Sequence, residues 1–180
     1  MDFYCRANKS ALGTINPWIG SAIIFPLALY YVINAGSFTF IDYLNLLLHE
    51  GGHGIFRVFG KFIYTLGGSL MQIIIPSMFI VFYWFKKKRF LAQIFLIWLG
   101  ENLMNISTYV SDARTQQLPL LGGNKVYHDW NYLLGVTGLL KYDTVFSNMI
   151  FICGVIMFLL ALLIPLFIRD YQTAEVNLNI

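Results

Sequence analysis

The chain has 180 residues, of which 58% are hydrophobic and only 12% are charged, and its formal net charge is +3. Soluble domains are about a quarter charged, so this composition predicts an integral membrane protein and argues against a soluble domain. The basic residues do not form a stripe along the sequence, so we expect no nucleic-acid partner. The expected environment is therefore the lipid bilayer.

Five apolar segments are candidates for membrane helices, because a crossing needs roughly 20 largely apolar residues. In chain order they are residues 18–33, 40–59, 62–85, 90–110 and 144–168. The second segment can lie in a membrane only if its ionisable residues face the protein interior; these include His49, Glu50, His53 and Arg57. We predict an all-α fold: a polytopic bundle of about five transmembrane helices forming a single domain over residues 1–180, located in the plasma (inner) membrane.

Short turns join the first four helices, whereas one long connection, residues 111–143, precedes the fifth. Long connections in small proteins are usually functional or disordered. The stretches "LPLLGG" and "HDWNYLLG" within it are apolar and aromatic, which favours a structured loop. If successive helices alternate in direction, this loop shares one face with the ends of the second and fourth helices. The same alternation predicts that the two ends of the chain lie on opposite faces.

The second helix carries a sequence that matches H-E-x-x-H, namely His49-Glu50-Gly51-Gly52-His53. Four residues advance a helix by about 400°, so the two imidazoles project from one face and can bind one zinc ion at about 2.0–2.1 Å. Zinc lowers the pKa of a bound water toward about 7, and Glu50 can take the proton as general base. Ionisable groups are costly in lipid, so three of them here indicate a functional site. The two glycines favour close approach of another helix or of a substrate backbone.

A catalytic zinc site needs a third protein ligand and one open position. The remaining histidine, His128, lies in the long loop, which should face the motif, and it is the first candidate. Asp129 and Asp112 are the alternatives, each as a ligand or as the acceptor that orients an imidazole through its second nitrogen.

The fourth predicted helix is unusually polar for a lipid-facing surface, with "GENLMNISTYVSDAR" near its end. Asn102 and Asn105 share a helical face with Asp112. These amides could position a substrate or stabilise an oxyanion. The alternative is hydrogen bonding that holds the helices together, and Gln72 on the third helix has the same two possible roles.

A membrane-embedded H-E-x-x-H helix resembles the site-2-protease family of zinc metalloproteases, which cleave substrates within or beside the bilayer. The resemblance rests on His49, Glu50 and His53, and the pair Gly67-Gly68 is similar to a glycine-containing stretch that follows the motif helix in that family. It implies zinc as cofactor, and a membrane protein or peptide as substrate. In that family the third ligand is an aspartate of a later helix in a Leu-Asp-Gly context, which this chain lacks.

The leading hypothesis is therefore a zinc-dependent intramembrane hydrolase, similar to a metalloprotease, that acts on membrane proteins or peptides. One alternative is a zinc-dependent lipid amidase or related hydrolase. Another is a non-catalytic membrane protein that binds or transports a metal.

Overall fold

The computed structural model describes residues 16–118 and 128–167, and this part of the chain is helical with short turns. The main helices are α2 (Ile19–Ile33), α3 (Phe40–Phe56), α4 (Lys61–Phe85), α5 (Arg89–Ser111), α6 (Asp129–Val136) and α7 (Asp143–Leu163). Short 3-10 turns cover Asn16–Trp18, Arg57–Phe59, Leu140–Tyr142 and Ile164–Leu166. The all-α prediction is confirmed for the described residues, and α6 is an additional helix within the predicted loop.

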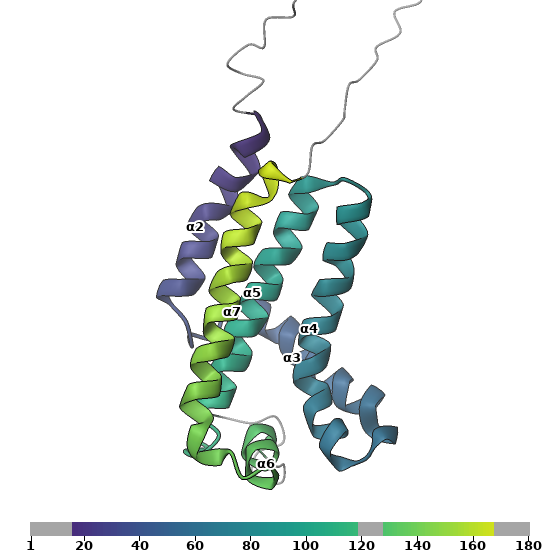
Figure 1. The fold of residues 1–180 in the computed structure, drawn as a ribbon, viewed down its shortest axis with the longest axis vertical. Coiled ribbons are helices and arrows are strands. Elements are labelled where there is room, and N and C mark those ends of the chain that lie inside the picture. Colours follow the sequence, from purple (N-terminus) through teal and green to yellow (C-terminus); the bar gives the residue numbers. More distant parts are fainter. Residues whose placement is uncertain (1–15, 119–127, 168–180) are drawn as a thin grey trace, which may run out of the picture.

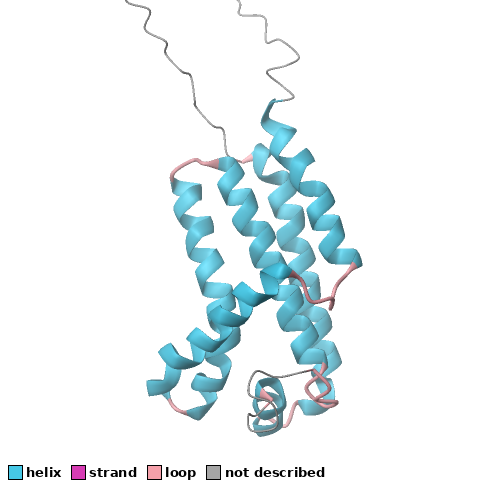
Figure 2. Ribbon diagram, turned by 180° about the vertical axis from the view of Figure 1, so that it is seen from behind, coloured by secondary structure: helices cyan, strands magenta, loops and turns pink. Residues whose placement is uncertain are grey.

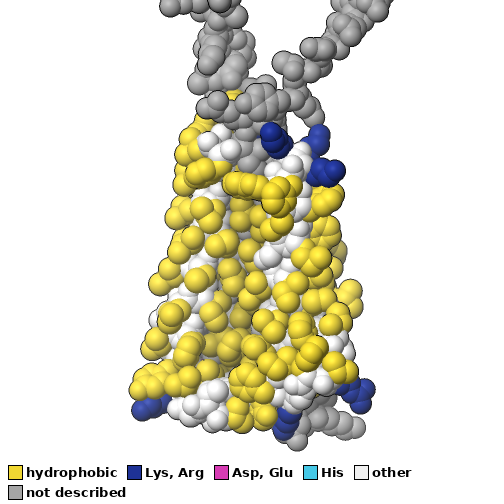
Figure 3. All heavy atoms as spheres, turned by 45° about the vertical axis from the view of Figure 1, so that its right-hand side comes forward, with side chains coloured by type: hydrophobic (Ala, Val, Ile, Leu, Met, Phe, Trp, Pro, Cys, Tyr) yellow, Lys and Arg dark blue, Asp and Glu magenta, His cyan; other side chains and the backbone are white. Residues whose placement is uncertain are grey.

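Among the described residues, three helices are long and apolar enough to cross a membrane: α4, α5, and α7 together with its flanking turns, Leu140–Leu166. The surface is of the kind that a membrane bundle has, because Figure 3 shows a broad hydrophobic band with lysine and arginine side chains at its two ends. By contrast, α2 has 15 residues and α3 has 17. At 1.5 Å per residue they extend about 22 and 26 Å, less than the roughly 30 Å of hydrocarbon. The prediction of five spans is not confirmed.

Helices α2 and α3 together traverse the bundle once, as Figures 1 and 2 show from opposite sides. The start of α2 is fixed beside α5 and α7, where the Ser21 hydroxyl donates to the Leu162 carbonyl (2.8 Å) and accepts from Gln93 Nε2 (2.8 Å). The chain turns at residues 34–39, partway along the bundle, and α3 continues to the other end. The first and last described residues consequently lie at the same end (Figure 1). The prediction of opposite faces concerns the two ends of the chain, which lie outside the described residues.

Helix α5 is the central element, and apolar residues of α2 and α7 pack against it. Their buried core consists of Ile24, Ala28, Ala92, Leu96, Ile97, Met104, Phe158, Ala161 and Ile164. Because other helices surround α5, its polar residues face protein and not lipid. The ends of α3 and α5 lie with α6 at the end of the bundle away from the α4–α5 turn (Figure 1), as the alternation of helices predicts. This end carries the candidate site.

Candidate metal centre

One face of α3 is polar and buried, although most of the other residues of the helix are apolar. Asp42, Asn45, His49 and Gly52 are its buried residues, and their spacing of three or four residues places them on a single helical stripe. His53 lies one turn after His49, and the two rings are 4.8 Å apart between centroids, nearly perpendicular. The two motif histidines therefore share one face, as their spacing predicts.

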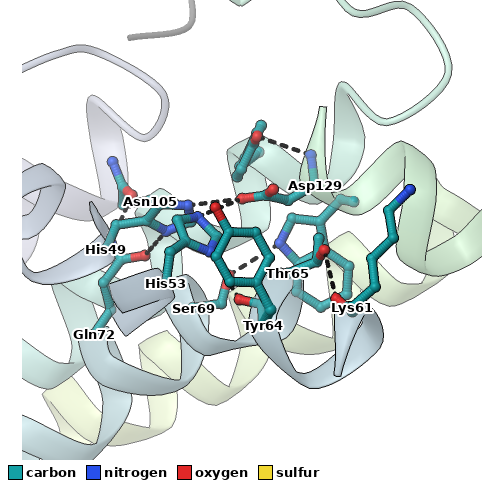
Figure 4. A network of polar contacts seen from close by, with 11 residues as sticks. His49, His53, Lys61, Tyr64, Thr65, Ser69, Gln72, Asn105 and Asp129 are labelled. Carbon is teal, nitrogen blue, oxygen red and sulfur yellow. Dashed lines mark hydrogen bonds and ion pairs between the residues drawn. The ribbon is translucent and has the colours of Figure 1, made fainter. Parts of the chain in front are cut away.

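Both imidazoles point at one carboxylate from a different helix (Figure 4). The distance from Asp129 Oδ2 is 2.9 Å to His49 Nε2 and 3.1 Å to His53 Nε2. One ligand atom from each of these three residues lies within 4.8 Å of the others. Two imidazole nitrogens and one carboxylate oxygen are donors that suit zinc and related divalent metals. The group could hold one metal ion.

Asp129 is the first residue of α6, and hydrogen bonds to α4 and to the end of α5 fix this short helix in place. The Asp129 N–H donates to the Tyr109 hydroxyl (3.1 Å), Trp130 Nε1 donates to Ser69 Oγ (3.1 Å), and Asn131 Nδ2 donates to the Ala113 carbonyl (2.8 Å). Burial raises the pKa of the Asp129 carboxyl, but the hydrogen bonds from the two histidines outweigh it and hold the pKa below its ordinary value. Asp129 is thus held as a carboxylate facing the imidazoles.

The other nitrogen of each motif histidine contacts an oxygen that only accepts hydrogen bonds. His53 Nδ1 is 2.8 Å from the Tyr64 carbonyl, and His49 Nδ1 is 3.0 Å from Gln72 Oε1. Each Nδ1 must therefore carry a hydrogen and donate it. In the neutral imidazoles both Nε2 atoms then present lone pairs toward the Asp129 oxygen. Between the two Nε2 atoms and the Asp129 oxygen, either a second proton on each imidazole or one shared cation is then needed. In metal-binding histidines, the ring nitrogen that does not face the metal is typically hydrogen-bonded in this way.

His128 does not belong to this group, although it was the first candidate for the third ligand. Its side chain is 1% exposed, and Nε2 lies 3.0 Å from Asp112 Oδ2. Successive residues at the start of a helix project about 100° apart, so His128 and Asp129 face different surroundings. The geometry replaces His128 by Asp129, and Asp112 is a partner of His128 and not of the motif.

The remaining predicted residues lie in different surroundings. Glu50 is exposed and lines the same cavity as His49, His53 and Asp129. Asn105 also lines this cavity, but its amide joins Gln72 to Asp42 through hydrogen bonds. Asn102 is fully buried and donates to the Trp98 carbonyl of its own helix. Of the two asparagines, only Asn105 is near the motif.

Glycines allow α3 and α4 to approach closely at the motif. A Cβ at Gly52 would overlap the Gly67 carbonyl, and a Cβ at Gly68 would lie 2.5 Å from the His49 ring. Gly51 has no neighbouring atom within 4 Å of such a Cβ. The expectation that a glycine of the motif admits another helix holds for Gly52 and not for Gly51.

The three residues His49, His53 and Asp129 are called the metal group below. A cavity of about 650 Å³ extends from it to the turn between α2 and α3. Its lining is mixed: Tyr31, Leu46 and Met104 are apolar or aromatic, whereas Asp42 and Glu101 are acidic. This volume is in the range of small-molecule and cofactor sites. An extended part of a substrate could lie in it with one bond next to the metal group.

Three contributors escape the sequence-based predictions: Asp42, Tyr109, and the backbone carbonyl of Tyr64. Asp42 was predictable from the sequence, because a charged residue seven positions before His49 falls on the same helical face. Tyr109 gave no comparable signal, since tyrosine is ordinary near the end of a membrane helix. A backbone carbonyl has no sequence signal at all.

Comparison with protein-family models, with curated proteins and with solved structures finds no match.

Proposed function

We propose that this chain is a zinc-dependent hydrolase of the plasma (inner) membrane that cleaves membrane proteins or membrane-proximal peptides, in the manner of the site-2-protease family. The observation that carries the proposal is the convergence of His49 Nε2, His53 Nε2 and Asp129 Oδ2, with Nδ1 of both histidines held as a donor. A histidine pair with an aspartate of a later helix is also the ligand set that the family resemblance implies.

The residues of the site have separate roles in amide hydrolysis. When bound, zinc would polarise the amide carbonyl and acidify water next to it. Glu50 lines the cavity beside the ligands, and it takes a proton from the attacking water. The oxygen of that water bonds to the carbonyl carbon, the C–N bond breaks, and Glu50 returns the proton to the leaving amine.

Tyr109 is suited to stabilise the negative charge that develops on the carbonyl oxygen. Its oxygen accepts the Asp129 N–H at 3.1 Å, so its own hydrogen remains available to a group in the cavity, which Tyr109 also lines. A hydroxyl donor aimed at a developing oxyanion is a frequent device in acyl transfer.

The test compares Glu50→Gln with His53→Ala in membranes of expressing cells. Glu50→Gln removes the base but leaves the ligands, so metal content should stay near one per chain while turnover falls about 10²–10⁴-fold. His53→Ala should lose metal and turnover together. Turnover is followed by mass spectrometry of new protein N-termini, with lipid profiling in parallel.

Each outcome selects a function. New N-termini that require Glu50 support the peptidase, whereas lipid products that require Glu50 support the amidase in its place. Full function of Glu50→Gln combined with loss in His53→Ala would show a non-catalytic metal protein and overturn the hydrolase.

A further inference from the structure

A chain of hydrogen-bonded side chains leads from the beginning of α3 to His49 and passes through two other helices. Asn105 Nδ2 on α5 donates to Asp42 Oδ1 (2.8 Å), and Gln72 Nε2 on α4 donates to Asn105 Oδ1 (3.0 Å). Gln72 Oε1 then contacts His49 Nδ1 (3.0 Å). Asp42 and Gln72 are only 4% and 2% exposed, so these hydrogen bonds are largely shielded from bulk solvent. Figure 4 shows Asn105, Gln72 and His49 adjacent to one another.

Asp42 determines which group donates and which accepts in this chain of hydrogen bonds. Its Oδ2 accepts the N–H (2.6 Å) and the hydroxyl (2.8 Å) of Thr39, the residue before α3 begins. An acidic side chain in the first turn that bonds back to the cap residue is a stabilising arrangement, and the helix dipole favours its negative charge. A carboxylate can only accept hydrogen bonds. Asn105 must therefore turn its NH₂ group toward Asp42.

Each amide transmits that constraint to the next. With the NH₂ group of Asn105 on Asp42, its oxygen faces Gln72, which has to present its own NH₂ group there. The Gln72 oxygen is then left for His49, whose Nδ1 has to donate. A neutral imidazole with hydrogen on Nδ1 has its lone pair on Nε2, the atom that lies 2.9 Å from Asp129.

We propose that Asp42 is a positioning residue for the metal centre: through Asn105 and Gln72 it fixes the tautomer of His49 in which Nε2 is free to bind metal. This inference rests on the metal centre of the proposed function, but not on hydrolysis. It assigns to Asn105 the transmission of this constraint in place of substrate positioning. It also explains why a charged residue is kept on the buried face of α3, eleven residues before His53.

The decisive variant is Asp42→Asn, which preserves size but allows the side chain to donate. Its oxygen would accept from Thr39 and its NH₂ group would face Asn105, so both amides of the chain would turn over. The NH₂ group of Gln72 would then donate to His49 Nδ1 and move the hydrogen to Nε2. We expect the affinity for Zn²⁺ or Co²⁺ to fall by about 10–100-fold, as for loss of other groups that orient metal ligands.

The double variant Asp42→Asn/Gln72→Glu should restore the affinity. A carboxylate at position 72 accepts from His49 Nδ1 and from Asn105 without help from position 42. The matched control is Asp143→Asn, another buried acid in the first turn of a helix, which accepts from Arg114 Nε (2.7 Å) outside this chain of hydrogen bonds. It should bind metal as the wild type does.

Metal titration of purified protein is combined with ¹⁵N NMR of the metal-free histidines at a pH where both imidazoles are neutral, which reads the tautomer directly. Hydrogen on Nδ1 of His49 in the wild type and on Nε2 in Asp42→Asn supports the inference. An unchanged tautomer and affinity in Asp42→Asn would overturn it, and so would a loss that Gln72→Glu does not rescue. Absence of metal binding in the wild type would instead refute the metal centre itself.

Discussion

Two histidine–aspartate arrangements occupy the same end of the bundle, and they differ in how the carboxylate is used. Both oxygens of Asp112 are occupied: the Thr115 hydroxyl and the Gln117 N–H donate to Oδ1, and the Leu118 N–H and His128 share Oδ2. Asp129 instead places one oxygen between two imidazole nitrogens and borders the cavity. All acceptor positions of Asp112 serve to hold the chain that follows α5, whereas Asp129 faces the two imidazoles and the cavity.

Metal content separates the two arrangements most strongly. Asp129→Ala removes the oxygen on which both Nε2 atoms converge, so bound metal should fall to background and any hydrolysis should stop. Asp112→Ala should keep about one metal per chain, because Asp112 contacts neither motif histidine. Metal analysis of detergent-purified protein is the measurement. Equal loss of metal in the two variants would show that both aspartates serve one centre.

Gly52→Ala should damage only the region of the motif. The added methyl group overlaps the Gly67 carbonyl and forces α3 away from α4, at a cost of about 1–3 kcal/mol and with weaker metal binding. Gly51→Ala is the matched control, since its methyl group meets no atom and alanine favours a helix by up to about 1 kcal/mol. Thermal unfolding with and without zinc tests both. A Gly51→Ala variant as unstable as Gly52→Ala would contradict the packing.

His128→Ala should destabilise the fold without releasing metal. The imidazole is buried and its loss leaves Asp112 without one partner, which costs about 1–3 kcal/mol, or about 2–4 °C of Tm per kcal/mol for a chain of this size. When a chelator has removed the metal, His53→Ala should lower Tm less than His128→Ala does, because the His53 side chain borders the cavity. If His128→Ala lost metal at unchanged Tm, His128 would be a ligand after all.

Acid should affect the two regions at different pH values. Burial raises the pKa of the Asp112 carboxyl, but its hydrogen-bond donors outweigh this and hold the pKa below its ordinary value of 3.8. A lowered folded-state pKa gives stability that is present above the unfolded value and is lost as pH falls through the folded value. Metal binding requires unprotonated imidazoles, so metal should leave on milder acidification.

Metal content and Tm measured against pH check this order. Asp112→Asn should be less stable at neutral pH but should lose less of its stability below pH 3.8 than the wild type does. Loss of metal and of the Asp112 contribution in one common step would contradict the separation of the two regions.

The sequence predicts α2, α3, α4 and α5 well, because each is an apolar run that is followed by glycine, lysine or a polar turn. It also predicts α7 but not the short helix α6. It also predicts the shared face of the motif and the long loop. It does not reveal that α2 and α3 share one traverse. That arrangement depends on how deep the turn at residues 34–39 packs beside α5, where Gly36 approaches Thr108, and such contacts are tertiary.

The third member of the metal group shows the same limit at the scale of one residue. His128 and Asp129 are neighbours, and a shift of one position in the register of α6 would point His128 where Asp129 now points. Hydrogen bonds from Asp129, Trp130 and Asn131 to three distant residues decide where α6 lies. A histidine adjacent to an aspartate in a loop carries no information about which of them turns inward.

The traverse shared by α2 and α3 has a consequence for fusion proteins. Because the start of α2 and the end of α7 lie at the end of the bundle away from α6 (Figure 1), reporters joined there would emerge in the same compartment. That compartment is opposite the face where the histidines and Asp129 lie. An affinity tag or a fluorescent domain at either position would therefore leave the approach to the cavity from the α6 side free.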